Sequence, residues 1–256
     1  MINAIKVIAL NTYKESIRDR ILITLGVFAV LLLGATLFLG SISLDQDSKI
    51  IIELGLTGIF FFGIIITIFL SGSSIAKELD QRTAYTVLAR PITRLTYLLG
   101  KFAGLCLTVL MLIGMMSVIF GALLVIRLGW QVIDVTLILA LFYTYLEMVL
   151  LIALTVMFSS FCSAVISTVY ALAIFIIGHS SATVVNLSQD SPVWIKDLYK
   201  AVYYIFPNLE KFNLRNNVVY HIQPTAEQIS LVIVYTVVYS AILLFLANAA
   251  FRKQEL

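Results

Sequence analysis

Residues 74–101, SIAKELDQRTAYTVLARPITRLTYLLGK, form a polar segment between two long apolar runs. The segment combines a charged stretch, an Arg-Pro-Ile-Thr-Arg turn and a basic return into apolar sequence. The apolar runs that flank it are long enough to cross a membrane. The polar segment therefore separates two predicted membrane spans, and its charged character predicts contact with another protein outside the membrane.

The composition of the whole chain predicts an integral membrane protein. Hydrophobic residues make up 61% of the 256 residues and charged residues 12%, whereas soluble domains average about 45–50% apolar and about 25% charged residues. A transmembrane helix needs about 20 mainly apolar residues, and six stretches meet this requirement. We expect a single all-α membrane domain, residues 1–256, with spans at residues 21–40, 54–75, 95–126, 135–158, 162–186 and 229–251.

The positions of Lys and Arg indicate the orientation of these spans, because cytoplasmic loops are enriched in both residues. With the amino end placed inside, eleven of the 17 basic residues fall on the cytoplasmic side, and five of them lie in the polar segment. Both chain ends and the polar segment are therefore expected in the cytoplasm. The net charge of +3 is explained by these flanking residues and requires no nucleic-acid partner.

Residues 1–20 predict a helix that lies on the cytoplasmic surface of the membrane. At helical periodicity, apolar residues share one side and polar residues the other, although Lys6 and Arg20 interrupt the apolar side. A solvated basic tail is the alternative. The following apolar run is too long for a signal peptide, so we expect it to stay as the first span. The apolar side holds Ile2, Ile5, Ala9, Leu10, Tyr13 and Ile17.

Residues 187–228 form the one long segment expected on the opposite side of the membrane. Ser191-Pro192 is a helix-start signal, and apolar residues then recur at helical spacing as far as Ile205. Pro207-Asn208 ends this helix. Thr225 and Gln228 have the spacing of a capping box, which predicts the start of the last span.

The sequence gives little sign of catalytic or cofactor chemistry. There is no phosphate-binding loop, so we do not expect this chain to hydrolyse ATP or to be an enzyme. Cys106 and Cys162 are isolated, whereas a zinc site needs grouped ligands. Residues 178–182, GHSSA, resemble a hydrolase elbow without its closing glycine, which leaves an intramembrane protease as an alternative. We expect His179 to hydrogen-bond within the helix bundle or to line a cavity.

Glu147 is the one carboxylate deep inside a predicted span. An ionisable group at such a position costs about 3 kcal/mol on insertion scales and normally faces the bundle interior or a wet cavity. Two interpretations stay open. Glu147 belongs to a transport pathway, or it has no transport role. In the second case it makes a hydrogen bond that holds helices together, to Tyr143, Tyr145 or a hydroxyl on another helix, or it simply lies close to the membrane boundary. Glu147 and His179 are thus the candidate pathway residues.

The polar segment itself contains a short apolar stripe at i, i+4 spacing, formed by Ile75, Leu79, Thr83 and Val87. Pro91 disfavours helical geometry at Arg90, so the chain is expected to turn before the next span begins near Arg94. A short cytoplasmic helix tethered to two spans suits the transmission of force from a soluble partner. The alternative is a solvated loop that obeys the positive-inside rule.

Three motifs in this region are similar to the segment between the second and third spans of ABC-2 type exporter permeases. They are residues 78–83 (ELDQRT), 87–94 (VLARPITR) and 98–102 (LLGKF). In that family the segment commonly reads E-x-E-x-G-T, then L-L-A/S-R/K-P-I/V-S/T-R, then L-L-G-K. Arg82 replaces the usual glycine. Residues 205–213 (IFPNLEKFN) also resemble the P-N-x-E-x-F-N stretch before the last span in a subset of these permeases.

The resemblance implies the permease subunit of an ATP-driven exporter in a bacterial or archaeal inner membrane. Two such subunits, identical or related, would form the pathway and bind two cytoplasmic ATPase subunits, which would hold ATP and Mg²⁺. Residues 76–94 would be the coupling helix, and residues 191–206 would form re-entrant helices buried against protein. Lipids and an extracytoplasmic accessory protein complete the expected partners. The coupling residues would be Glu78, Asp80, Arg82, Thr83, Arg90, Pro91 and Arg94.

Other functional classes remain as alternatives. An ion-coupled secondary transporter needs titratable groups near the membrane midplane, for which Glu147 and His179 are the available residues. A membrane scaffold, or the protease, would leave the polar segment unexplained.

Overall fold

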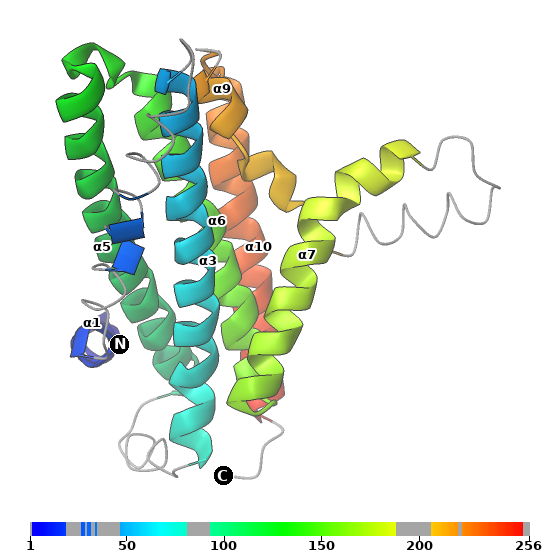
Figure 1. Ribbon diagram of the computed structural model, residues 1–256. Helices are drawn as coiled ribbons and strands as arrows, with labels where there is room; N and C mark the ends of the chain where they lie inside the picture. Colours follow the sequence, from blue (N-terminus) through cyan, green and yellow to red (C-terminus); the bar gives the residue numbers. More distant parts are fainter. Residues whose placement is uncertain are drawn as a thin grey trace.

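The computed structural model describes residues 2–18, 27–28, 30–31, 34, 47–80, 93–187, 206–219 and 222–252 (Figure 1). Within these residues the chain is helical and contains no strand. The elements are α1 (Ile2–Arg18), α3 (Asp47–Asp80), α5 (Arg94–Leu128), η1 (Trp130–Val132), α6 (Val135–Ser159), α7 (Ala164–Leu187), η3 (Leu209–Phe212), α9 (Arg215–Val219) and α10 (Ala226–Arg252).

Four helices of the described residues are long and apolar enough to cross a membrane: α3, α5, α6 and α10. They correspond to the predicted spans at residues 54–75, 95–126, 135–158 and 229–251. The fifth predicted span, residues 162–186, forms the apolar helix α7. The first predicted span, residues 21–40, lies mostly outside the described residues, as do the expected re-entrant helices apart from Phe206.

Local sequence signals fix where the helices begin. Thr93 caps α5, because its side chain accepts a hydrogen bond from the amide of Thr96, and Asp134 caps α6 by accepting from the amide of Val135. The predicted capping box before α10 is confirmed. The Thr225 amide donates to Gln228 Oε1 at 3.0 Å, and the Gln228 amide donates to Thr225 Oγ1 at 3.3 Å.

Helix α3 is longer than the span predicted from the sequence. It continues without a break to Asp80, so the first part of the expected coupling segment extends the membrane helix. Residues 76–80 (AKELD) contain no glycine or proline that would stop a helix. Residues 81–92 lie outside the described part of the chain, and four of the predicted coupling residues are among them: Arg82, Thr83, Arg90 and Pro91.

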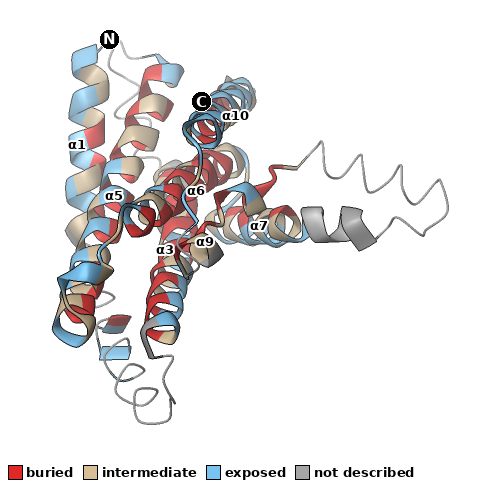
Figure 2. Cartoon of the chain, turned by 90° about the horizontal axis from the view of Figure 1, so that it is seen from above, coloured by how far each residue is buried: buried red, intermediate tan, exposed pale blue. Residues whose placement is uncertain are grey.

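Helix α6 occupies the centre of the bundle. It buries a larger share of its apolar span than α3, α5 or α10 does, and it contacts all three of these helices as well as α7. Figure 2 shows the buried residues gathered around α6, with exposed residues on the outer sides of α1 and α10. A buried polar side chain on α6 therefore finds its partner in α6 itself, as Thr144 and Thr155 do, or in a neighbouring helix.

Helix α1 runs roughly perpendicular to the long helices and packs against the first part of α5 (Figure 1). Figure 1 shows α1 nearly end-on, whereas the long helices stand upright. Two glycines of α5 allow the close approach. A Cβ atom on Gly100 would lie 2.7 Å from Ile8 Cβ, and one on Gly104 would lie 2.6 Å from the Ala9 carbonyl oxygen. Small residues at four-residue spacing permit such close packing of helices in membranes.

Polar contacts join α1 to α5 at two levels. Tyr13 donates a hydrogen bond to Met111 Sδ at 3.0 Å, while Glu15 faces Lys101, ten residues closer to the start of α5. The residues buried against α5 are Ala9, Thr12 and Ser16.

The predicted apolar stripe of α1 is not a single buried face. Ile2 is 71% exposed and Leu10 is 53% exposed. The small residues Ala9, Thr12 and Ser16 are the buried ones, and together with Ile8 they lie against α5 where its two glycines give room. The larger apolar residues Ile2 and Leu10 stay exposed.

We expect Gly104→Val to destabilise the protein by about 1–3 kcal/mol, since the added atoms overlap the α1 backbone. Gly114→Val is the matched control, because a Cβ atom at Gly114 of the same helix meets open space. Thermal unfolding in detergent and proteolytic release of α1 measure the effect. An equal loss of stability in both variants would contradict the packing of α1 on Gly104.

Candidate functional site

Glu147 makes its contact across the bundle and not with a nearby tyrosine. Its side chain is 1% exposed, and Oε1 lies 2.8 Å from Nε2 of His179 on α7. Glu147 makes no hydrogen bond to Tyr143 or Tyr145, the two tyrosines that the sequence offered as partners. The Tyr145 hydroxyl points to the Cys106 carbonyl oxygen at 3.5 Å, and the Tyr143 hydroxyl has no hydrogen-bond partner among the described residues. The two candidate pathway residues therefore contact each other directly.

The second nitrogen of the His179 ring is also engaged. Nδ1 lies 3.2 Å from Oε2 of Glu210 in η3. Phe60 of α3 and Phe175 of α7 pack edge-on against the imidazole, with centroid distances of 5.5 and 4.8 Å. The ring is held between two carboxylates and two aromatic rings, which fixes its orientation. In this arrangement neither ring nitrogen is available to activate Ser180, so the geometry does not favour the hydrolase interpretation.

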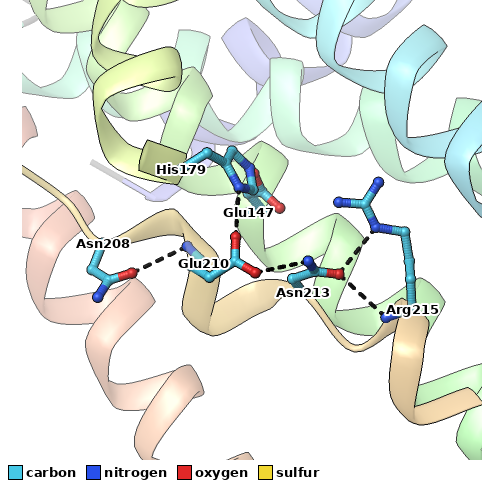
Figure 3. Close-up of polar contacts among 6 residues, drawn as sticks. All are labelled: Glu147, His179, Asn208, Glu210, Asn213 and Arg215. Carbon is cyan, nitrogen blue, oxygen red and sulfur yellow. Dashed lines mark hydrogen bonds and ion pairs between the residues drawn. The ribbon is translucent and has the colours of Figure 1, made fainter. Parts of the chain in front are cut away.

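The turn that carries Glu210 is built by the asparagines of the PNLEKFN sequence (Figure 3). Asn208 Oδ1 accepts a hydrogen bond from the Glu210 amide at 3.1 Å, which starts the short helix η3. Asn213 Nδ2 donates to Glu210 Oε1 at 2.9 Å and so orients the carboxylate toward His179. The Asn208 amide donates to the Tyr235 hydroxyl at 2.9 Å, which attaches the turn to α10.

Arg215 completes the cluster at the start of α9. Its backbone amide and Nε donate to Asn213 Oδ1 at 3.4 and 3.1 Å. The guanidinium carbon lies 3.9 Å from the centroid of the Phe60 ring, a cation–π contact. Partial burial lowers the pKa of Arg215, and the carboxylates of Glu147, Glu210 and Glu53 act in the opposite direction. Because an arginine side chain stays protonated in proteins, the cluster contains one permanent positive charge.

Gly178 allows η3 to reach the histidine. A Cβ atom at this position would lie 2.7 Å from the Pro207 carbonyl oxygen and 2.8 Å from Leu209 Cγ. The glycine of the GHSSA sequence thus has a packing role, because it lets the turn lie against α7 one residue before His179.

The described coupling residues lie at the other end of the bundle, where α3 ends and α5 begins. The Glu78 carboxylate accepts hydrogen bonds from the Tyr97 hydroxyl and from the ammonium group of Lys101. Lys101 is only 4% exposed and also lies 3.8 Å from Glu15 of α1. Arg94 Nη1 donates to the Phe251 carbonyl oxygen at 2.7 Å. The side chain of Asp80 lies outside the described part of the structure.

Several members of both clusters were not predicted from the sequence. Glu210, Asn213 and Arg215 join His179, while Tyr97 and Lys101 join Glu78. The P-N-x-E-x-F-N spacing was the available signal for the first group. It indicated a resemblance, and only the fold shows that its carboxylate meets the histidine of α7.

Four helices long and apolar enough to cross a membrane define a helical membrane protein, and one of them, α6, carries the buried Glu147. Residues 21–256 match the family described as "Protein of unknown function (DUF2705)". The match covers most of the chain, so the protein belongs to the DUF2705 family. No curated protein matches the chain.

Replacing His179 by Phe should destabilise the protein by about 3–5 kcal/mol, because Glu147 would be left buried without its partner. The double variant Glu147→Leu/His179→Phe should recover most of this loss, since no buried charge remains unpaired. Chemical unfolding in detergent compares the two. A double variant as unstable as His179→Phe would show that the contact does not govern stability.

Proposed function

We propose that this chain is the membrane-spanning subunit of an ATP-driven exporter of the ABC-2 type. In this proposal it has six spans and cytoplasmic chain ends. It pairs with a second permease subunit, identical or related, and binds two separate ATPase subunits that hold ATP and Mg²⁺. The sequence resemblance at residues 78–102 and 205–213 supports the proposal.

The observation that carries the proposal is the connection between the two ends of residues 81–92. Glu78 at the end of α3 accepts hydrogen bonds from Tyr97 and Lys101 near the start of α5. Hydrogen bonds between charged groups are about twice as strong as neutral ones. A force applied to residues 81–92 by a cytoplasmic partner would therefore move α3 and α5 together.

The same connection extends to two further helices. Lys101 lies 3.8 Å from Glu15 of α1. On the other side, Arg94 donates to the Phe251 carbonyl oxygen, and the Tyr97 ring stacks on the Phe251 ring of α10 at a centroid distance of 6.1 Å. Four helices thus meet where the proposed ATPase would bind. Such a junction suits a subunit that converts movement of a soluble partner into rearrangement of membrane helices.

ATP in the partner subunits would act by shifting the balance between two arrangements of the membrane dimer. A ligand shifts such an equilibrium only through its different affinities for the two states. In the proposed mechanism, residues 76–94 transmit that difference, and the Glu78–Lys101 contact joins them to the bundle. The inner membrane as location, and residues 191–206 as a cap on the pathway, follow from the family resemblance.

The direct test is to express the chain with its native neighbouring genes and purify it in mild detergent. A protein with a phosphate-binding loop, present in stoichiometric amount with vanadate-sensitive ATPase activity, would support the exporter subunit. Its reproducible absence would reject the proposal and favour ion-coupled transport through Glu147 and His179.

Within such a complex, Glu78→Gln and Lys101→Met should lower ATPase stimulation by transport substrate or lipid several-fold, with the rate expressed per assembled complex. Both changes remove the charged contact between α3 and α5. Arg127→Gln is the control, because Arg127 is exposed at the far end of α5. ATPase rates of the purified complexes measure the effect, and unchanged rates in both variants would contradict the coupling role.

A further inference from the structure

The contacts of His179 require more hydrogens than its neutral form supplies. A neutral imidazole has one N–H group and one acceptor nitrogen, and an ionised carboxylate only accepts hydrogen bonds. In the structure both ring nitrogens face carboxylate oxygens, at 2.8 Å for Glu147 and 3.2 Å for Glu210. Two hydrogens must therefore lie between these three groups. The arrangement therefore holds one more proton than two ionised carboxylates and a neutral histidine would supply.

The charges around the histidine favour that additional proton. Glu147 of α6 and Glu210 of η3 face His179 directly, and Arg215 of α9 attracts both carboxylates. The α3 side contributes the uncharged Phe60 next to the ring and Glu53 near Arg215. The α7 side contributes the uncharged Phe175. Apart from Glu53, which is exposed, the charges of two carboxylates, one guanidinium and an imidazolium sum to zero, and a balanced cluster is less costly to bury than one with a net negative charge.

We propose that Glu147, His179 and Glu210 form a binding site for one proton, and that this proton holds residues 206–219 against α7. The site is independent of the exporter proposal, because it rests only on the contacts of the histidine. Proton release breaks one N–H bond of the imidazolium. The proton passes to water, and a neutral histidine with a single N–H remains between the two carboxylates.

Burial decides which contact survives the release. Glu147 is 1% exposed, so it has no solvent to replace a lost hydrogen bond, whereas the Glu210 side chain is 42% exposed. An unpaired buried group is the more costly of the two. The remaining N–H therefore stays with Glu147, and the contact between His179 and Glu210 is lost. The turn η3 is then attached to α10 through Asn208 and Tyr235 but no longer to the α7 histidine.

Hydrogen–deuterium exchange of the protein in lipid nanodiscs tests the proposal. Protection of residues 206–219, relative to intrinsic exchange at each pH, should fall about tenfold between about pH 5 and about pH 9, a range that brackets the ordinary pKa of histidine. Exchange in α6 serves as the internal reference. Constant protection of residues 206–219 across this range would overturn the proposal.

Isosteric variants separate proton binding from a purely structural contact. In Glu210→Gln the amide donates to Nδ1 while Nε2–H remains with Glu147, so both contacts form without the additional proton. In Glu147→Gln the new amide donates to Nε2 while Nδ1–H remains with Glu210, so again both contacts form without the additional proton. Each variant should keep residues 206–219 protected and lose the pH dependence.

Glu53→Gln is the matched control and should keep the pH profile of the unmodified protein, since Glu53 acts on Arg215 and not on the histidine. A wild-type profile in Glu147→Gln or Glu210→Gln would overturn the proposal. The two variants make the same prediction independently, so the test stands if one of them fails to fold.

Discussion

A charged side chain inside a membrane-spanning bundle must find its partner within the protein, because lipid offers none. Glu147 sits on α6, the most enclosed helix, and its carboxylate is almost fully buried. This position requires a donor from a neighbouring helix, which His179 of α7 supplies. The histidine in turn presents a second nitrogen, and η3 comes to it past Gly178. One buried carboxylate thus determines how α6, α7 and the turn before α10 fit together.

The need to pair a buried charge within the protein also determines the packing at the opposite end of the bundle. Lys101 is buried where α5 begins, and its ammonium group is surrounded by Glu78 of α3 and Glu15 of α1. Here too, glycine makes the approach possible, since Gly104 gives α1 room to lie against α5. At both ends a buried charge is paired across helices beside a glycine that removes the steric obstacle. Apolar packing fills the space between the two charged layers.

The sequence predicted the helices well and the contacts between them poorly. Hydropathy gave the extents of α3, α5, α6, α7 and α10 to within a few residues, except for the early start and late end of α3. Capping residues such as Thr225 and Gln228 act locally, so their roles were readable. Glu147 and His179 were each identified as ionisable groups in a span. Their pairing joins residues 32 positions apart on different helices, and no periodicity encodes such a distance.

Helix α3 links the two charged layers physically. It is continuous from Asp47 to Asp80, with Phe60 against His179 and Arg215 in one layer and Glu78 in the other. At a rise of about 1.5 Å per residue, these two positions are about 27 Å apart on one rigid element. Coupling between distant sites needs an element that both sites can bias. On the proposed function, α3 carries a movement imposed at Glu78 to Phe60, whose ring packs against His179. Protonation of the histidine would act back on the same helix, because reciprocal effects on a shared equilibrium are required by thermodynamic linkage.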